Sequence, residues 1–243
     1  MNIPLRRSGR ARLLQRISLV LAWGCLVTAL GCGHKPTAPR AVATSPAPVP
    51  STPIAVADFL QWCWQNRSTD QYGFIFTDDY VFDFAVGDSV GNFYRSTPWG
   101  RSDELMMAVH LFHDGTPSNP PASSITLDFT QEPTNEPDAR PGMNPRWHRF
   151  ITTQVLLRVN LPDGTQEIRG AEYFFMVRGD SAQISPDLAA AGVRPDSTRW
   201  WIERWVDGSL QSGPAESSTP GPGRENAMPS RKFTLGQLKA LYR

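Results

Sequence analysis

The chain has 243 residues, with 24 Lys and Arg against 23 Asp and Glu. Five of the basic residues and none of the acidic ones lie in residues 1–31, so residues 32–243 hold 19 basic and 23 acidic groups, a net charge of −4. No basic stripe remains there, which argues against a nucleic-acid partner.

Residues 1–31 have the layout of an export signal. Five arginines precede the apolar run Ile17–Leu30, whose 14 residues match the apolar region of a signal peptide. A membrane-spanning helix needs more, roughly 20 residues. The segment Ala29-Leu30-Gly31-Cys32 follows and resembles the bacterial lipobox. An uncleaved N-terminal anchor and an ordinary secretory peptide are the alternatives.

The lipobox resemblance implies that Cys32 carries the lipid anchor, a palmitate-type acylation, and becomes the first residue of the mature protein. It implies a membrane partner and a location in the cell envelope. Because Gly33 follows, we expect the outer membrane, facing the periplasm or the surface, if the source has two membranes. Residues 32–52 are rich in Pro, Ala, Thr and Ser and predict an extended tether. With Cys32 lipidated and the signal removed, Cys63 has no disulfide partner, and we expect it as a small buried hydrophobe.

Residues 53–208 are long enough for one domain with its own core. Thr52 and Pro53 predict a helix start, and the helix should end near Asn66 with Val56 and Phe59 on its apolar face. A short second helix from Ser68 should carry aromatic residues inward. Asp78 and Asp79 should end it.

The next segment combines a strand and a helix. Aromatic residues alternate over Tyr80–Val86, which predicts a strand. A turn-rich loop or hairpin is expected over residues 87–100. Ser102 predicts the N-cap of a further helix that ends at Asp114, with Glu104 in its first turn, where the helix dipole favours acids.

The second half of the domain is predicted to be β. Polar and apolar residues alternate over Ser124–Thr130, whereas residues 131–145 hold four prolines and predict a surface loop. Two long strands, at about 147–160 and 165–178, are joined by a turn at Pro162-Asp163-Gly164. Another loop, with a turn of helix near residues 187–191, precedes a last strand at 199–207. Helices followed by an antiparallel meander form an α+β plan.

The end of the chain contains a linker and a helix. Residues 209–230 are rich in Ser, Gly and Pro and predict a flexible linker. Residues 231–243 predict a C-terminal helix capped by Thr234, with an apolar face. So short a helix is marginal alone in water, so we expect it to dock. It can dock on its own domain, closing an open end of that domain, or on a partner protein.

The order of elements over about 155 residues resembles the NTF2-like (SnoaL-like) superfamily. The resemblance is carried by Phe59–Phe84, with the run NRSTDQYGFIFTDDYVFDF, and by Trp200–Asp207, WWIERWVD. It implies a cone in which a curved antiparallel sheet packs on N-terminal helices around a pocket. The superfamily contains isomerases, dehydratases, epoxide hydrolases and non-enzymes, so the fold leaves the function open.

In the superfamily's enzymes a carboxylate inside the apolar cone acts as a general acid or base, because burial raises its pKa. The catalytic candidates here are Glu172, Glu203, Asp83 and His110. Tyr80, Arg149 and Arg204 are candidate partners for them. Period-2 alternation places Trp201, Glu203 and Trp205 on one face of the last strand. An ion pair on the outer sheet face is the alternative for each carboxylate.

The candidate pocket-lining residues are aromatic: Phe59, Tyr80, Phe82, Trp201 and Trp205. We expect no cofactor and no metal, since His110 and His113 have no third ligand at a supporting spacing. The expected function is a non-catalytic binding or structural module that takes a small apolar ligand. The alternative is an isomerase or hydrolase that uses a cone carboxylate. A homodimer through the sheet is a further expectation.

Overall fold

A computed structural model of the chain describes residues 46–94, 96–209 and 231–243. These residues all lie in one compact unit, Thr44–Arg243. The predicted signal peptide, Cys32, the tether up to residue 45 and the linker at 210–230 lie outside the described residues. Within the described ranges, no helix is both long and apolar enough to cross a membrane.

The two N-terminal helices begin and end close to where the sequence predicts. Helix α1 is Pro53–Asn66, and the Thr52 hydroxyl accepts a hydrogen bond from the Ala55 N–H at 3.1 Å. Its apolar face, Cys63 included, is buried. Burial raises the pKa of the Cys63 thiol to about 12, as expected for a packing residue. Helix α2 is Thr69–Gly73.

The segment after α2 departs from the prediction in two places. Strand β1 is Phe76–Asp83, so the two aspartates at 78 and 79 lie within a strand and do not precede it. The predicted loop at 87–100 contains helix α3, Gly91–Tyr94, and strand β2, Trp99–Gly100. Pairing of Trp99 with Phe82 in β1 keeps the chain extended up to Gly100.

Helix α4 is Arg101–Val109 and continues as the π-helix η1, His110–Asp114. The sequence predicted Ser102 as its N-cap, but the N-cap is Gly100. The Gly100 N–H donates to the Asp103 carboxylate at 3.1 Å, which fixes the helix start two residues early.

A single curved sheet forms the rest of the domain, in the order β2-β1-β6-β5-β4-β3, with β7 beside β5. Strands β4, His148–Leu161, and β5, Gly164–Arg178, form the predicted hairpin. Strand β6 is Trp200–Ser209, antiparallel to β5 and parallel to β1. Helix α5, Pro186–Ala190, lies in the loop between β5 and β6.

Strand β3 is Ser124–Pro137 and is longer than predicted. It pairs with β4 up to Pro137, across two register shifts between Phe129 and Thr134. Pro133 and Pro137 lie in β3 and are tolerated because β3 is an edge strand, where a missing N–H costs no ladder hydrogen bond. Pro141 and Pro145 lie in the loop between β3 and β4, as predicted.

The chain ends in strand β7, Arg231–Lys232, and helix α6, Leu235–Leu241. The Thr234 hydroxyl caps α6 as predicted, accepting from the Gln237 N–H at 3.0 Å. Leu235, Leu238 and Tyr242 are buried in the main hydrophobic core. The helix therefore docks on its own domain, the first of the two expected arrangements.

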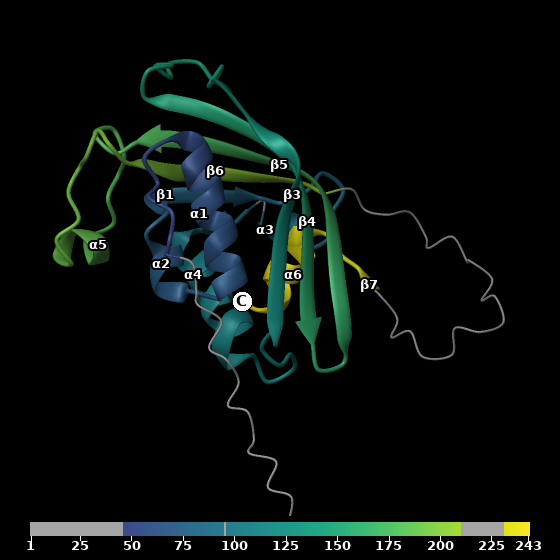
Figure 1. Ribbon diagram of the computed structural model, residues 1–243. Helices are drawn as coiled ribbons and strands as arrows, with labels where there is room; N and C mark the ends of the chain where they lie inside the picture. The colour runs from purple at the N-terminus through teal and green to yellow at the C-terminus, as the bar shows by residue number, and fades with distance from the viewer. Residues whose placement is uncertain (1–45, 95, 210–230) are drawn as a thin grey trace, which may run out of the picture. The chain divides into compact units, whose positions relative to one another are not determined.

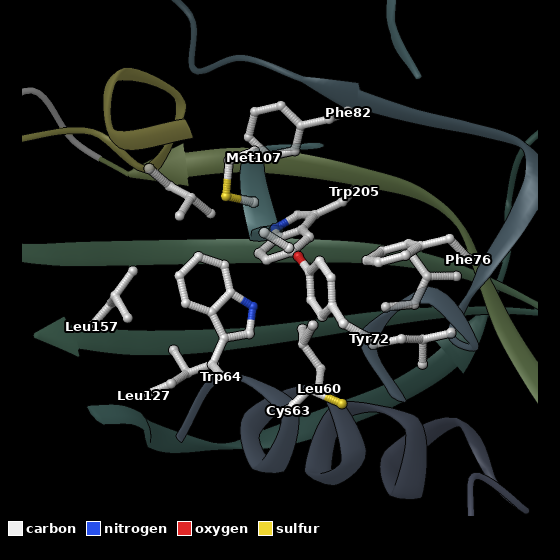
Figure 2. Close-up of a cluster of buried hydrophobic side chains, with 14 of the residues drawn as sticks. Leu60, Cys63, Trp64, Tyr72, Phe76, Phe82, Met107, Leu127, Leu157 and Trp205 are labelled. Carbon is white, nitrogen blue, oxygen red and sulfur yellow. The ribbon is translucent and has the colours of Figure 1, made fainter. Parts of the chain in front are cut away.

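The predicted α+β class is confirmed by this architecture: a curved, unclosed and mostly antiparallel sheet packs on N-terminal helices, which is the arrangement that the resemblance implies. Figure 1 shows α1, α2, α4 and α6 on the concave side of the sheet. The main core fills the space between the helices and the sheet (Figure 2), where Trp64 and Tyr72 point toward Trp205.

Candidate functional site

A polar group lies at the centre of the concave interior. The carboxylate of Glu104 on α4 is fully buried. It accepts hydrogen bonds from Tyr72 Oη at 2.5 Å, Tyr80 Oη at 3.3 Å and Trp99 Nε1 at 2.8 Å. The Lys239 ammonium on α6 completes the set, with Nζ 2.7 and 2.9 Å from the two carboxylate oxygens.

Glu104 was predicted only as an acid of the first helical turn, and its place in the interior was not predicted. The buried face of α4 and η1 consists of Glu104, Met107, Ala108, Leu111 and Phe112. The spacing from Glu104 to Met107, Ala108 and Leu111 is that of one helix face. This periodicity was the available signal, and Val109, which lies off this face, is 37% exposed.

Lys239 is also fully buried. Its Nζ lies 3.7 Å from the ring centres of both Phe82 and Trp205, a cation–π contact with each ring. Burial lowers the pKa of Lys239, and the neighbouring Glu104 charge opposes that shift. Burial also raises the pKa of Tyr72 and of Tyr80 well above the usual value, with the Glu104 charge adding to it, so both phenols act as donors.

Further hydrogen bonds hold α6 in this position. Thr234 Oγ1 donates to Asp88 Oδ2 at 2.5 Å, and the Gly236 N–H donates to Asp207 Oδ2 at 2.8 Å. A Cβ on Gly236 would overlap the Phe84 ring, so only glycine allows this approach. The backbone of α6 is thus held independently of the Lys239 side chain.

Glu172 on β5 is the one predicted catalytic candidate that the structure places inside the cone. It is fully buried, and its Oε2 accepts from Trp205 Nε1 at 2.6 Å. Its Oε1 has no hydrogen-bond partner within the described ranges. Burial, followed by the charge of Asp207, raises the pKa of Glu172 well above its usual value. Burial therefore favours the protonated form of this carboxyl, and its Oε1 has no partner among the described residues.

A small cavity lies beside Glu172. Its volume is about 10 Å³, close to the minimum for a single water molecule. Apart from Glu172 its walls are hydrophobic side chains of α1, β3, β4, β5, β6 and α6, among them Leu127, Leu157, Phe174, Trp205 and Leu235. The cone is therefore nearly filled by its own chain.

Glu203 does not share a face with Trp205, contrary to the prediction. The register between β5 and β6 shifts, because Phe175 pairs with Arg204 and Met176 with Ile202, so Glu203 is an extra, unpaired residue. Such a bulge reverses the alternation beyond it. Trp205 joins the main core, whereas Glu203 forms an ion pair with Arg140.

Asp83 and His110 lie apart from the interior carboxylates. Asp83 forms a partly exposed ion pair with Arg204, at 2.5 Å. His110 Nδ1 lies 2.7 Å from the Tyr242 carbonyl oxygen. Arg149 bonds Asn135 on β3 at 2.7 Å. The structure therefore does not join these candidates into one site with Glu172.

Of the predicted pocket-lining aromatic residues, Tyr80, Phe82 and Trp205 surround the Glu104–Lys239 pair, as the preceding contacts show. Phe59 packs in the main core and is not among the cavity-lining side chains. Trp201 belongs to a second, smaller cluster with Val177 and Leu188. The β6 bulge separates it from Trp205, so its assignment to the pocket was wrong.

One group in the described part of the chain has three side chains within reach of a single metal ion: Asp138, His148 and Glu203, with ligand atoms within 4.8 Å of one another. The Arg140 guanidinium bonds both Asp138 and Glu203. It already supplies the positive charge that these carboxylates attract. We call these four residues the outer ion-pair cluster.

No family model matches the chain, and no curated protein matches its sequence. Solved structures of similar fold include a candidate aromatic ring hydroxylase from Novosphingobium aromaticivorans, 16% identical, which covers 65% of this chain and 85% of its own, with a TM-score of 0.43. An NTF2-like superfamily protein from Salmonella enterica is 13% identical, covers 66% and 91%, and has a TM-score of 0.40. A candidate scytalone dehydratase from Novosphingobium aromaticivorans is 7% identical, covers 64% and 79%, and has a TM-score of 0.41. None of these likenesses bears on activity.

Proposed function

We propose that the chain is a lipid-anchored protein of the bacterial cell envelope whose cone is a non-catalytic binding module. One observation carries the second half of this proposal. Side chains of the chain itself, Leu235 of α6 among them, leave only a cavity of about 10 Å³ in the cone, too small for a substrate. The walls of that cavity are apolar, so the ligand that enters when α6 shifts has an apolar body.

A cavity-opening variant tests the binding module. Leu235 is 3% exposed and lines the cavity, so Leu235→Ala enlarges an apolar space without removing a polar contact. Apolar cavities of sufficient size stay dry and bind small hydrocarbons. We expect toluene to raise the melting temperature of Leu235→Ala in the full-length chain. The matched control is Leu241→Ala, at a 37% exposed position of the same helix, which toluene should leave unchanged. Equal responses would contradict the proposal.

The anchor rests on the sequence of residues 1–32. Labelling of cells with radioactive palmitate should mark the wild-type protein and not Cys32→Ala. The control is Cys25→Ala, which removes a cysteine within the apolar run and should keep the label. Equal labelling of wild type and Cys32→Ala would contradict lipidation.

Glu172 favours a second candidate function, a hydrolase or isomerase. It combines full burial, a raised pKa and an unpartnered oxygen beside the cavity, as a general acid or base requires. Hydrolysis of styrene oxide to its diol, compared between wild type and Glu172→Gln, separates the two. The binding module predicts the same background rate for both. A wild-type rate that Glu172→Gln abolishes would establish the enzyme.

A further inference from the structure

The Lys239 side chain occupies a place built for a cation. An ammonium buried in an apolar core is costly unless its charge and its donors are compensated. Here a carboxylate receives it at 2.7 and 2.9 Å, and two aromatic ring faces lie 3.7 Å away. We call Glu104, Phe82 and Trp205 the ammonium site.

The parts of the ammonium site belong to the domain and not to α6. Phe82 is on β1, Glu104 on α4 and Trp205 on β6. Tyr72 and Trp99 donate to the Glu104 carboxylate and hold its orientation. These donors belong to the domain, so the scaffold holds the Glu104 carboxyl group in place independently of the Lys239 side chain.

The ammonium site adjoins the apolar cavity. Trp205 contributes to both, with one ring face toward Nζ of Lys239 and its indole N–H donating to Glu172 at the cavity wall. A ligand that spans the two places would have an apolar body and a primary ammonium end.

We infer that the cone recognises a primary alkylammonium group, and that Lys239 of α6 is a tethered occupant of that site which a free alkylamine can replace. This inference rests on the proposed binding module and names its ligand class. Because an occupant on the same chain has a high effective concentration, a free amine competes poorly unless Lys239 is absent or α6 has moved.

Chemical rescue tests the inference in the full-length chain. The Lys239→Ala variant removes three methylene groups and the ammonium, which together are the atoms of n-propylammonium. The hydrogen bonds of Thr234 and Gly236 remain to hold α6 in place. We expect n-propylammonium to raise the melting temperature of Lys239→Ala in a saturable way. Its half-saturating concentration should be at least tenfold lower than for the wild-type protein.

Three controls separate recognition of the ammonium from filling of a hole. Propan-1-ol has the same length without the charge, and should raise the melting temperature by far less at equal concentration. Lys239→Met fills the same space with an uncharged side chain and should not respond to n-propylammonium. In Glu104→Gln/Lys239→Ala the saturable response should be lost. A response to propan-1-ol equal to that of the amine would overturn the inference, as would no saturable response in Lys239→Ala.

If Lys239→Ala does not fold alone, refolding yield replaces the melting temperature as the readout. Recovery of folded protein with n-propylammonium, but not with propan-1-ol, supports the site, and no recovery overturns it. The toluene experiment on Leu235→Ala uses neither the charge nor Lys239. Toluene binding without amine rescue would reject the ammonium site and keep the binding module.

Discussion

Two clusters of charged side chains in the described part of the chain, the Glu104–Lys239 pair and the outer ion-pair cluster, differ in what surrounds them. In the interior, Glu104 and Lys239 have no exposed side-chain surface. In the outer ion-pair cluster the side chains of Arg140 and Glu203 are 27% and 16% exposed. Removing one partner of an ion pair should therefore lower the free energy of unfolding strongly in the interior, where desolvation is complete. The loss should be small in the outer cluster, where water screens the charges.

The largest expected effect follows from removing one member of the interior pair. Lys239→Met leaves the Glu104 carboxylate buried without its cation. Breaking a buried pair in this way should lower the free energy of unfolding by about 3–5 kcal/mol. Urea denaturation followed by tryptophan fluorescence measures it. A loss below about 1 kcal/mol would mean that the interior pair behaves like a surface pair.

The second prediction concerns the pH dependence of Glu172. Its pKa in the folded state is raised well above 4.5 by burial, so the folded chain retains a proton that the unfolded chain releases. Its contribution to stability is therefore present at low pH and is lost as pH rises above about 4.5 toward the folded pKa, with a slope of at most about 1.4 kcal/mol per pH unit.

Glu172→Gln removes that titration. The stability of Glu172→Gln relative to wild type should increase between pH 5 and pH 8, measured by urea denaturation at each pH. Asp207, whose pKa burial raises, and Lys239, whose pKa burial lowers, also act on this part of the interior. They are present in both proteins, so the difference between the two reports on Glu172 together with its interaction with Asp207. A difference that does not change with pH would show that Glu172 is ionised in the folded state.

The smallest effect is expected in the outer ion-pair cluster. Glu203→Gln removes the charge that Arg140 faces, but Arg140 keeps its bonds to Asp138 at 2.6 and 2.9 Å. We expect a loss of about 1 kcal/mol or less, which shrinks further in 1 M salt. Melting temperatures at low and high salt measure it. A loss as large as that of Lys239→Met would erase the distinction between the two clusters.

The parts of the fold that the sequence predicted are those set by local rules. The Thr52 cap, the turn at residues 162–164 and the Thr234 cap each depend on neighbours in the chain, and each is confirmed. The face assignment of β6 was wrong because the bulge at Glu203 arises from pairing with β5, which the sequence of one strand does not contain.

The candidate site shows the same division. Glu172 was a candidate because the resemblance implies a carboxylate in the cone, and the structure places it in the interior. Glu104 and Lys239 were not recognised, since each is in a helix where a charged residue ordinarily faces solvent. The two residues are 135 positions apart in the chain, and burial of both is tolerable only because their side chains form an ion pair. That pairing is a tertiary property, and neither helix shows it alone.

A double-mutant cycle between Glu104 and Lys239 tests most directly whether the interior holds a matched carboxylate–ammonium site. Urea denaturation would be measured for wild type, Glu104→Gln, Lys239→Met and the double variant. Because each single change leaves one buried group uncompensated, the double variant should be less destabilised than the two single losses together, by about 2–3 kcal/mol. Losses that add to within about 0.5 kcal/mol would contradict the account.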